Sequence, residues 1–401
     1  MPVELNDGKI LTSHGGNLPR PAEFDKVLAQ GEARRAEITA GLPGAVKYVV
    51  EKQIECGVDV INDGEYVKAA GGGGYGGYIF DRITGYELRA AGQSGPAKRG
   101  GVAERDRLLF PGTYESGLWL TGSGGPIRPG FATPGQAPAP FPALVATGEI
   151  KYTGQEAIAA DIAALKAGLE GHSEQGFIAA LGPLSLAAGR RNEFYSSEDE
   201  YMVAAAEAMR AEYKAVTDAG LIVQIDEPEF FTTWSFYPEW SVEDLRKYLE
   251  KGVEIINHSL EGVPQEQVRF HACWGSGHRP HVTDIEIKYI ADLLVKINAQ
   301  VYSVEAGNVR HAHEWKVWGD VKLPEGKKLQ PGVISHATDL VEHPDLVAER
   351  LLNYASVIGR ERVEGGTDCG IGSRVGHEEI VWAKLKSMSE GAAIASKELW
   401  K

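Results

Sequence analysis

The sequence predicts one α/β domain folded as a (β/α)8 TIM barrel, with an insertion after the second strand. Three features predict it: about eight short β-branched runs, long helical patterns between them, and one Gly- and Pro-rich interruption. Strands that alternate with helices of this length pair in parallel through right-handed crossovers, and eight of them favour a closed barrel. An open doubly wound sheet is the alternative. The whole chain, residues 1–401, fits one barrel domain.

The predicted strands are short apolar runs, each followed by polar or small residues. In chain order they are Lys9–Ser13, Val58–Asn62, Phe177–Leu181, Leu221–Ile225, Val268–His271, Gln300–Val304, Gly332–Ser335 and Arg362–Gly366. The helical patterns between them span Gly154–Glu170, Glu198–Ala219, Val242–Leu260, Thr283–Ile297, Pro344–Ile358 and His377–Lys397. This alternation is typical of a barrel.

The insertion covers about residues 71–142, where GGGGYGG, TGSGGPIRPG and TPGQAPAP leave only short hydrophobic pieces. This density of helix breakers excludes a long helix. We expect a β-hairpin and loops over the barrel mouth. Two roles stay open, a flexible surface excursion and an active-site lid.

The composition favours small molecules as partners. A formal net charge of −15 disfavours nucleic acid and anionic membrane surfaces, because both would be repelled. No apolar run reaches the roughly 18 residues that cross a bilayer, and the first residues, MPVELNDGKI, lack the pattern of a signal peptide. We therefore expect a cytoplasmic protein without nucleic-acid or membrane partners. The oligomeric state stays open, a homo-oligomer included.

Three of the predicted strands end in residues that bind metals. The fifth ends in His271-Ala272-Cys273, the sixth in Glu305 and the eighth in Asp368-Cys369-Gly370. The carboxyl ends of barrel strands meet on one face, so we expect these side chains to converge. One imidazole and two thiolates suit Zn²⁺ and leave one position for a carboxylate, water or substrate. Cys56, in a helical pattern before the second strand, is interpreted as a core residue.

Other strand ends supply polar groups. Asp226 follows the fourth strand and Glu65 the second, where each could hold a substrate ammonium or act as a base. A helix cap or a salt bridge is the alternative for both. The first strand leads into His14, Gly15 and Asn17, a turn whose glycines allow close approach of a ligand. His14 is interpreted equally as a ligand contact or as a satisfied loop histidine.

A sulfur-rich zinc site favours thiol chemistry. The metal lowers the pKa of a bound thiol, which then attacks carbon as a thiolate at neutral pH. Hydrolysis by zinc-bound water is the alternative, although hydrolytic sites more often use His and carboxylate ligands. The sequence HAHE at 311–314 is interpreted as a solvated helix start, with contact to an anionic substrate as the alternative.

Seven segments resemble, in order, the catalytic domain of cobalamin-independent methionine synthase and its single-domain relatives, including epoxyalkane:coenzyme M transferase. They are TSHGGNLPRP, VDVINDGEY, ALGPL, VQIDEP, HACWG, SVEAGN and GGTDCG. The matches span most of the chain, from Thr12 to Trp382. The resemblance implies that His271, Cys273 and Cys369 bind Zn²⁺, with Glu305 as a fourth ligand that a substrate thiol displaces.

The resemblance also implies substrate and catalytic residues. It places Glu65 and Asp226 near the thiol substrate, with Gly15 and Asn17 beside them. Asn17 stands where methionine synthases carry a serine, which leaves recognition of a homocysteine carboxylate open. His336 is an out-of-register counterpart of the proton-donating histidine of the family.

The function implied is zinc-dependent transfer of a methyl or small alkyl group to a thiol, of the 5-methyltetrahydrofolate:homocysteine type. The partners would be a small-molecule thiol and an alkyl donor. Alternatives are epoxide opening by a zinc-bound thiolate, a C–S lyase running this chemistry in reverse, and a non-catalytic zinc- or thiol-binding protein. The chain lacks the N-terminal half that helps full-length synthases hold folate, so the use of folate stays open.

Overall fold

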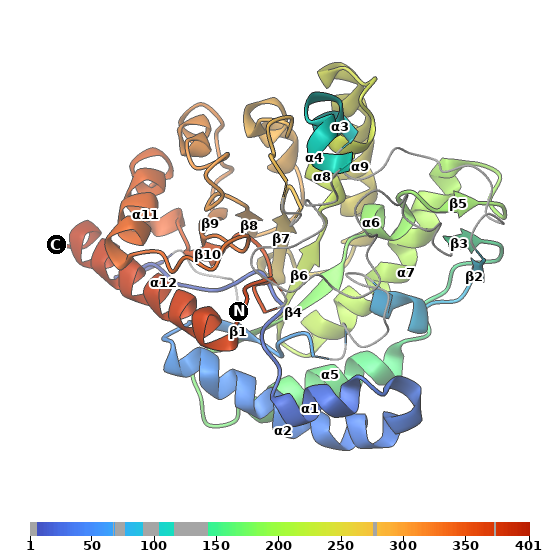
Figure 1. Ribbon diagram of the computed structural model, residues 1–401, viewed down its shortest axis with the longest axis horizontal. Coiled ribbons are helices and arrows are strands. Elements are labelled where there is room, and N and C mark those ends of the chain that lie inside the picture. The colour runs from blue at the N-terminus through green and yellow to red at the C-terminus, as the bar shows by residue number, and fades with distance from the viewer. Residues whose placement is uncertain are drawn as a thin grey trace.

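The computed structural model describes residues 6–66, 68, 77–90, 104–115, 143–275, 279–372 and 374–401. Its centre is a curled parallel sheet of seven strands (Figure 1). In order across the sheet these are β1 (Val60–Asn62), β4 (Gln175–Leu181), β6 (Ile222–Asp226), β7 (Val268–Ala272), β8 (Val301–Val304), β9 (Lys328–Ile334) and β10 (Gly366–Thr367). Each overlaps or adjoins a predicted strand, which confirms the TIM-barrel-like α/β fold.

The first predicted strand joins the two edges of this sheet. Thr12 forms a parallel bridge with Gly365, just before β10, and Ser13 N–H donates to the Gly365 carbonyl at 2.9 Å. On the other side, Val60 N–H of β1 donates to the Thr12 carbonyl at 3.0 Å. The segment therefore takes the place of an eighth strand and removes the open edges of the sheet.

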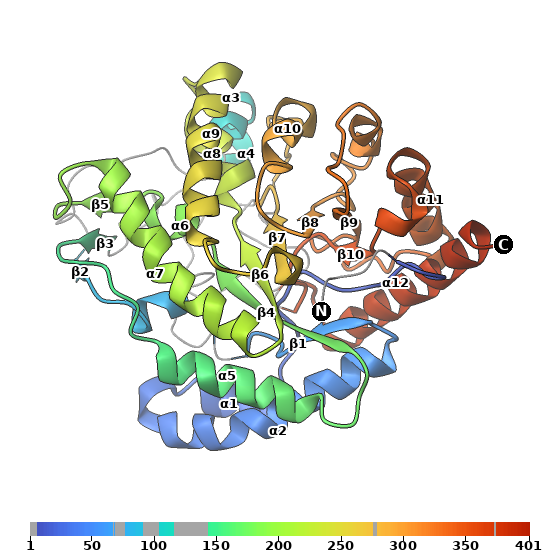
Figure 2. The ribbon, with the colours of Figure 1, turned by 180° about the vertical axis from the view of Figure 1, so that it is seen from behind.

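Helices cover the outside of the sheet (Figures 1 and 2). The longer ones are α2 (Arg35–Glu55), α5 (Gln155–Gly168), α7 (Glu198–Asp218), α9 (Val242–Ser259), α11 (Pro344–Ile358) and α12 (Glu378–Leu399). Shorter helical elements are α1 (Ala22–Leu28), η1 (Gly31–Arg34), α6 (Pro183–Ala187), α8 (Glu229–Phe236), η4 (Gln265–Gln267), η6 (Glu314–Gly319) and η7 (Arg360–Arg362). Every helix of the described ranges is too short or too polar to span a bilayer.

The long helix predicted over Thr283–Ile297 is wrong. The structure has a 3-10 turn, η5 (Ile287–Tyr289), and one short helix, α10 (Ala291–Leu294). The Ile287 N–H donates to the Glu314 carboxylate at 2.9 Å, and the Ile285 carbonyl accepts from the Trp274 ring N–H at 2.8 Å. Side chains from outside the segment thus occupy the backbone groups that a continuous helix would pair internally.

The described part of the insertion holds short elements. Strand β2 (Tyr86–Arg89) pairs antiparallel with β3 (Ala143–Ala146), and β3 pairs with β5 (Arg191–Asn192) in a small second sheet. Its other described elements are η2 (Gly77–Asp81), α3 (Glu104–Leu109) and α4 (Pro111–Glu115). Residues 71–76, 91–103 and 116–142 of the insertion lie outside the described residues, so the expected loops and the lid stay predictions.

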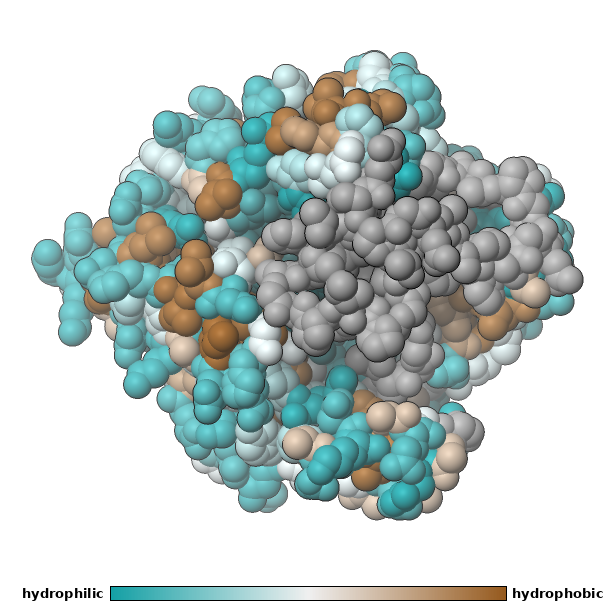
Figure 3. Space-filling model, viewed as in Figure 1, coloured by the Kyte–Doolittle hydropathy of each residue, from teal (hydrophilic) through white to brown (hydrophobic). Residues whose placement is uncertain are grey.

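The surface seen in Figure 3 is largely hydrophilic, with separate apolar patches. One lies in the region of α3, where Leu108 and Leu109 are largely exposed. The other side of α3 is anchored, because the buried Asp106 carboxylate pairs with Arg279 at 2.8 Å. This ion pair fixes α3 to the loop that follows β7, on the face where the strands end.

Candidate metal centre and substrate site

The structure brings His271, Cys273 and Cys369 together. One donor atom from each lies within 4.8 Å of the other two. His271 is in β7, Cys273 follows that strand directly, and Cys369 follows β10. His271 and Cys273 are buried and Cys369 is half-buried. Ligands from the central strand and from an edge strand of the sheet therefore meet because the sheet curls.

The His271 ring is oriented for metal binding. Its Nδ1 lies 3.1 Å from the hydroxyl of Ser303, the residue paired with it across β7 and β8. Its Nε2 is buried without a hydrogen-bond partner among the described residues. A buried imidazole nitrogen without a partner is costly, unless it coordinates an ion. Metal-bound histidines commonly donate their other nitrogen to a neighbouring acceptor, the role that Ser303 fills.

The two thiols are electrostatically coupled. A hydrogen bond from Cys273, helped by His271, holds the pKa of Cys369 well below its ordinary value although burial opposes this. The same hydrogen bond, followed by burial, raises the pKa of Cys273. Cys369 is thus already disposed to be a thiolate, the form that binds metals. Two sulfurs and one imidazole fit Zn²⁺ with one position left for a further ligand.

We expect Ser303→Ala to weaken zinc binding by about 10- to 100-fold, because His271 loses the group that fixes its ring orientation. Competition with a chromophoric chelator measures this affinity. Ser356→Ala, on the exposed side of α11, is the matched control and should bind zinc as the wild type does. Equal affinities of Ser303→Ala and the wild type would contradict this role.

Glu305 belongs to a second cluster, with His336 and Asp368, whose donor atoms also lie within 4.8 Å of one another. Its carboxylate accepts from the Trp274 backbone N–H at 2.8 Å and from Asn308 at 2.9 Å. Trp274 follows Cys273 directly, so this cluster adjoins the sulfur ligands. Ligation of zinc by Glu305 stays a prediction.

His336 is buried, and both ring nitrogens lack a hydrogen-bond partner among the described residues. Its Nδ1 lies 3.8 Å from the Asp368 carboxylate. Burial alone would lower its pKa, but Asp368 and the charges of Glu305 and Cys369 raise it. His336 is therefore placed to hold a proton beside the metal ligands.

Glu65 and Asp226 lie beside this centre. Asp226 is the register partner of His271 across β6 and β7, and Gln224 donates to it at 2.6 Å. Burial raises the pKa of Asp226 to about 6, while the nearby His271 opposes the rise. Burial, followed by the charge of Asp226, raises the pKa of Glu65 well above its ordinary value. The negative charge of each acid makes ionisation of the other less favourable. A substrate cation bound beside them would stabilise the ionised form of both.

The Gly15–Gly16 turn fits closely between these groups. A Cβ on Gly15 would lie 2.5 Å from the Cys369 backbone, and one on Gly16 would lie 2.0 Å from a Glu65 oxygen. Gly16 also has φ of +134°, which favours glycine. The predicted close approach is thus made to protein atoms, and the turn sets the positions of Glu65 and Cys369.

The neighbouring turn residues differ in their contacts. His14 is fully buried, with Nε2 2.7 Å from Gln53 Oε1 and Nδ1 accepting from the Gly16 N–H at 3.2 Å. Burial lowers its pKa to about 4. These contacts agree with the satisfied loop histidine. The Asn17 side-chain oxygen, in contrast, is buried without a partner among the described residues, so it is available to a substrate donor.

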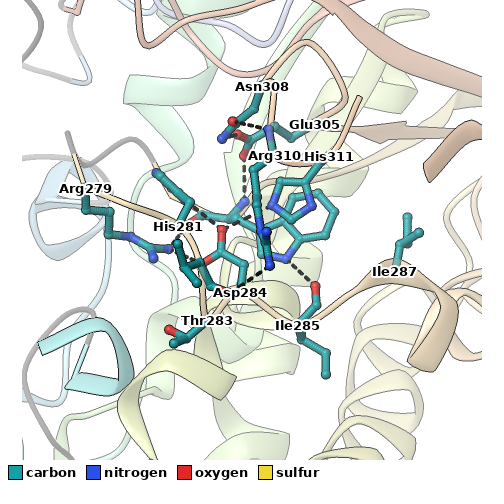
Figure 4. A network of polar contacts seen from close by, with 12 residues as sticks. Arg279, His281, Thr283, Asp284, Ile285, Ile287, Glu305, Asn308, Arg310 and His311 are labelled. Carbon is teal, nitrogen blue, oxygen red and sulfur yellow. Dashed lines mark hydrogen bonds and ion pairs between the residues drawn. The ribbon is translucent and has the colours of Figure 1, made fainter. Parts of the chain in front are cut away.

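A buried polar network joins the loops after β7 and β8 (Figure 4). Asp284 pairs with Arg279 and His281, each at 2.6 Å, and lies 3.2 Å from the His311 ring. His311 stacks on Trp274, whose backbone N–H binds Glu305. His311 is buried, so the interpretation as a solvated helix start is wrong for this residue. The network therefore adjoins Glu305 through Trp274.

We expect this network to lose stability at alkaline pH. Burial would lower the pKa of His311, but hydrogen bonds to Asp284 and Glu314 raise it to about 9. Because the folded-state pKa lies above the unfolded value of about 6.5, the stabilisation is complete below pH 6.5 and is lost as the pH rises through 9. Chemical denaturation at pH 6.5 and 9.5 should show a loss on the order of 2 kcal/mol. His311→Gln should show little of this dependence, and parallel losses in both proteins would contradict the assignment.

The fold and the site define a barrel protein with a Cys/His cluster, suited to hold a metal ion, at the carboxyl ends of its strands. A family model described as the cobalamin-independent synthase catalytic domain matches residues 178–394. That range covers more than half of the chain and contains all three metal-site residues together with Glu305 and Asp226. The chain belongs to this family.

Relatives of known name agree with this assignment. A methionine synthase of Saccharolobus islandicus is 27% identical over 221 residues, which are 54% of this chain and 58% of the relative. One of Thermococcus kodakarensis is 26% identical over 221 residues, 56% of its length. The match thus spans little more than half the length of these relatives.

Solved structures share the fold over nearly the whole chain. A B12-independent methionine synthase from Shewanella, in complex with selenomethionine, has a TM-score of 0.67 at 20% identity and covers 98% of this chain and 99% of its own. One described as a putative vitamin-B12 independent methionine synthase, from Listeria monocytogenes, has a TM-score of 0.62 at 16% identity over 98% and 99% of the two chains. At these identities the likeness concerns the fold alone.

Proposed function

We propose that this chain is a zinc-dependent transferase that moves a methyl group to the sulfur of a small thiol, as methionine synthases do. The observation that carries the proposal is the convergence of His271, Cys273 and Cys369 within 4.8 Å of one another, together with a buried His271 Nε2 that has no partner among the described residues. Family membership supports the reaction class. The proposed partners are a small-molecule thiol and a methyl donor.

The three residues would hold Zn²⁺, with Glu305 as an exchangeable fourth ligand. Bound there, zinc would keep the substrate thiol in its thiolate form at neutral pH. The chain itself would orient the substrate. Asp226 and Glu65 would bind its ammonium group, since the buried Asp226 and the half-buried Glu65 both have raised pKa values and lie beside the proposed metal ligands.

His336 would supply the proton that the departing donor group requires. Its imidazole lies in the Glu305–Asp368 cluster, and these carboxylates favour its protonated form. General acids of this kind work best with a pKa near the working pH. The loss of a methyl group leaves a basic atom on the donor, and His336 is placed to protonate it.

The test is a set of parallel assays on zinc-loaded protein. Homocysteine with 5-methyltetrahydrofolate should give methionine, measured by mass spectrometry. The same thiol with a small epoxide, and a thioether alone, test epoxide opening and lyase activity. Turnover only in the epoxide or thioether assay would overturn the proposal. Thiol binding without turnover in any assay would favour a carrier.

A further inference from the structure

Lys68 is a buried cation near the proposed substrate site that no described residue neutralises by direct contact. It ends the turn after β1, where its backbone N–H donates to the Glu65 carbonyl at 3.2 Å. The residue is only 7% exposed, and its Nζ has no hydrogen-bond partner among the described residues. Its Nζ lies 5.0 Å from the centroid of the Tyr78 ring. A buried ammonium without an acceptor is costly, and an acid group of a ligand would supply the acceptor that the described residues do not provide.

The acids around Lys68 are engaged elsewhere. Asp226 accepts from Gln224 at 2.6 Å, and Asp161 pairs with Arg82 at 2.6 Å. The positive charge of Lys68 nevertheless lowers the pKa of Asp226, of Asp161 and of Glu65. Lys68 therefore lies close enough to Glu65 and Asp226 to act on the same ligand, and its Nζ has no hydrogen-bond partner among the described residues.

Groups of both charges lie close together here, the acids Glu65 and Asp226 and the cation Lys68. The acids Glu65 and Asp226 would attract a substrate ammonium and repel a substrate acid. Lys68 is the side chain here that offers three N–H donors to an anion. The Asn17 side-chain oxygen, which has no partner among the described residues, can accept a hydrogen bond from a substrate ammonium but cannot donate one to a substrate acid.

We propose that Lys68 binds the acid group, a carboxylate or a sulfonate, at the end of the thiol substrate opposite its sulfur. This inference rests on the proposed thiol transfer and names a specificity-determining residue for it. Lys68 selects thiols with an acid group, and Asp226 with Glu65 selects an ammonium beside it. A thiol that carries an acid group and an ammonium would pair with Lys68 through the first and with Asp226 and Glu65 through the second.

The test compares the binding of three thiols to the zinc-loaded full chain by isothermal titration calorimetry. Homocysteine carries both groups, 3-mercaptopropylamine lacks the acid, and 4-mercaptobutyrate lacks the ammonium. In the wild type, homocysteine should bind more tightly than 3-mercaptopropylamine. In Lys68→Gln, the Kd of homocysteine and of 4-mercaptobutyrate should rise by about 30-fold or more, and that of 3-mercaptopropylamine should stay within about threefold.

Two further variants separate recognition from structure. Lys68→Arg keeps the charge and should recover part of the lost affinity for the acid-bearing thiols. Lys247→Gln, on the exposed side of α9, is the matched control and should bind all three thiols as the wild type does. Should Lys68→Gln fail to fold, the wild-type comparison and Lys68→Arg still decide the matter.

The outcomes also separate this inference from the function on which it rests. Equal weakening of all three thiols in Lys68→Gln would overturn it, since Lys68 would then act only as a counter-ion of Glu65 and Asp226. Unchanged binding, or equal wild-type affinity for homocysteine and 3-mercaptopropylamine, would overturn it as well, while the proposed function stands. If the wild type binds no thiol at all, the proposed function fails and this inference fails with it.

Discussion

Cys369→Ser should lose at least about a hundredfold in zinc affinity and all measurable methyl transfer. Loss of a group that only orients a metal ligand already lowers metal affinity by about 10- to 100-fold, so loss of a ligand itself should lower the affinity further. The effect should be large because Cys369 is the thiol whose pKa lies well below its ordinary value, and Cys273 alone lacks that bias. Metal content after gel filtration, measured by mass spectrometry, reports the loss.

The matched control is Cys56→Ser. Cys56 is buried at the end of α2, and its thiol donates to the Trp382 carbonyl at 3.5 Å, away from the metal centre. It should keep about one zinc per chain. Equal zinc retention in Cys369→Ser and Cys56→Ser would show that Cys369 is not a ligand.

Asp226→Asn should raise the Kd of an amino-bearing thiol by about 30- to 1,000-fold. Removing one partner of a buried charge pair typically costs about 2–5 kcal/mol, and part of that cost is the substrate charge left without a partner. Zinc content should stay at the wild-type level, because the expected ligands are all present. Calorimetry with homocysteine, and methyl transfer at saturating thiol, separate lost binding from lost chemistry.

Asp199→Asn, at the exposed start of α7, controls for the loss of one acid and should bind homocysteine normally. A thiol that lacks an amino group should bind Asp226→Asn at least as well as it binds the wild type. If both thiols lose affinity alike, Asp226 acts on the metal site or the fold instead of the ammonium.

The barrel could be predicted because periodicity and strand ends are local properties of the chain. The neighbouring strands β4, β6, β7, β8 and β9 of the main sheet are bounded by turns and helices that the sequence marks clearly. The failure at Thr283–Ile297 has a non-local cause, since Glu314 and Trp274 take the backbone groups of that segment. Neither contact is visible in the periodicity of the segment itself.

The convergence of His271, Cys273 and Cys369 could be predicted for a related reason. Histidine and cysteine are rare at strand ends, and the barrel brings such ends together. Ser303 could have been found, because it lies two residues before Glu305 and opposite His271 in a parallel pair. Lys68 could not, because an unpartnered ammonium is recognised only when its surroundings are known.

The buried polar network between the loops after β7 and β8 could not be predicted from the sequence either. HAHE at 311–314 is hydrophilic and was therefore assigned to the surface. Its burial depends on Asp284 and on the stacking of His311 against Trp274, which come from the preceding loop. Polar residues that satisfy one another are buried without any local signal.

X-ray absorption at the zinc edge of the loaded protein tests the central claim most directly. The account predicts two sulfur neighbours at about 2.3 Å and lighter neighbours at about 2.0–2.1 Å. Addition of homocysteine should raise the sulfur number to three, as its thiol takes the exchangeable position. A shell of nitrogen and oxygen alone, without sulfur, would contradict a metal centre built on Cys273, Cys369 and His271.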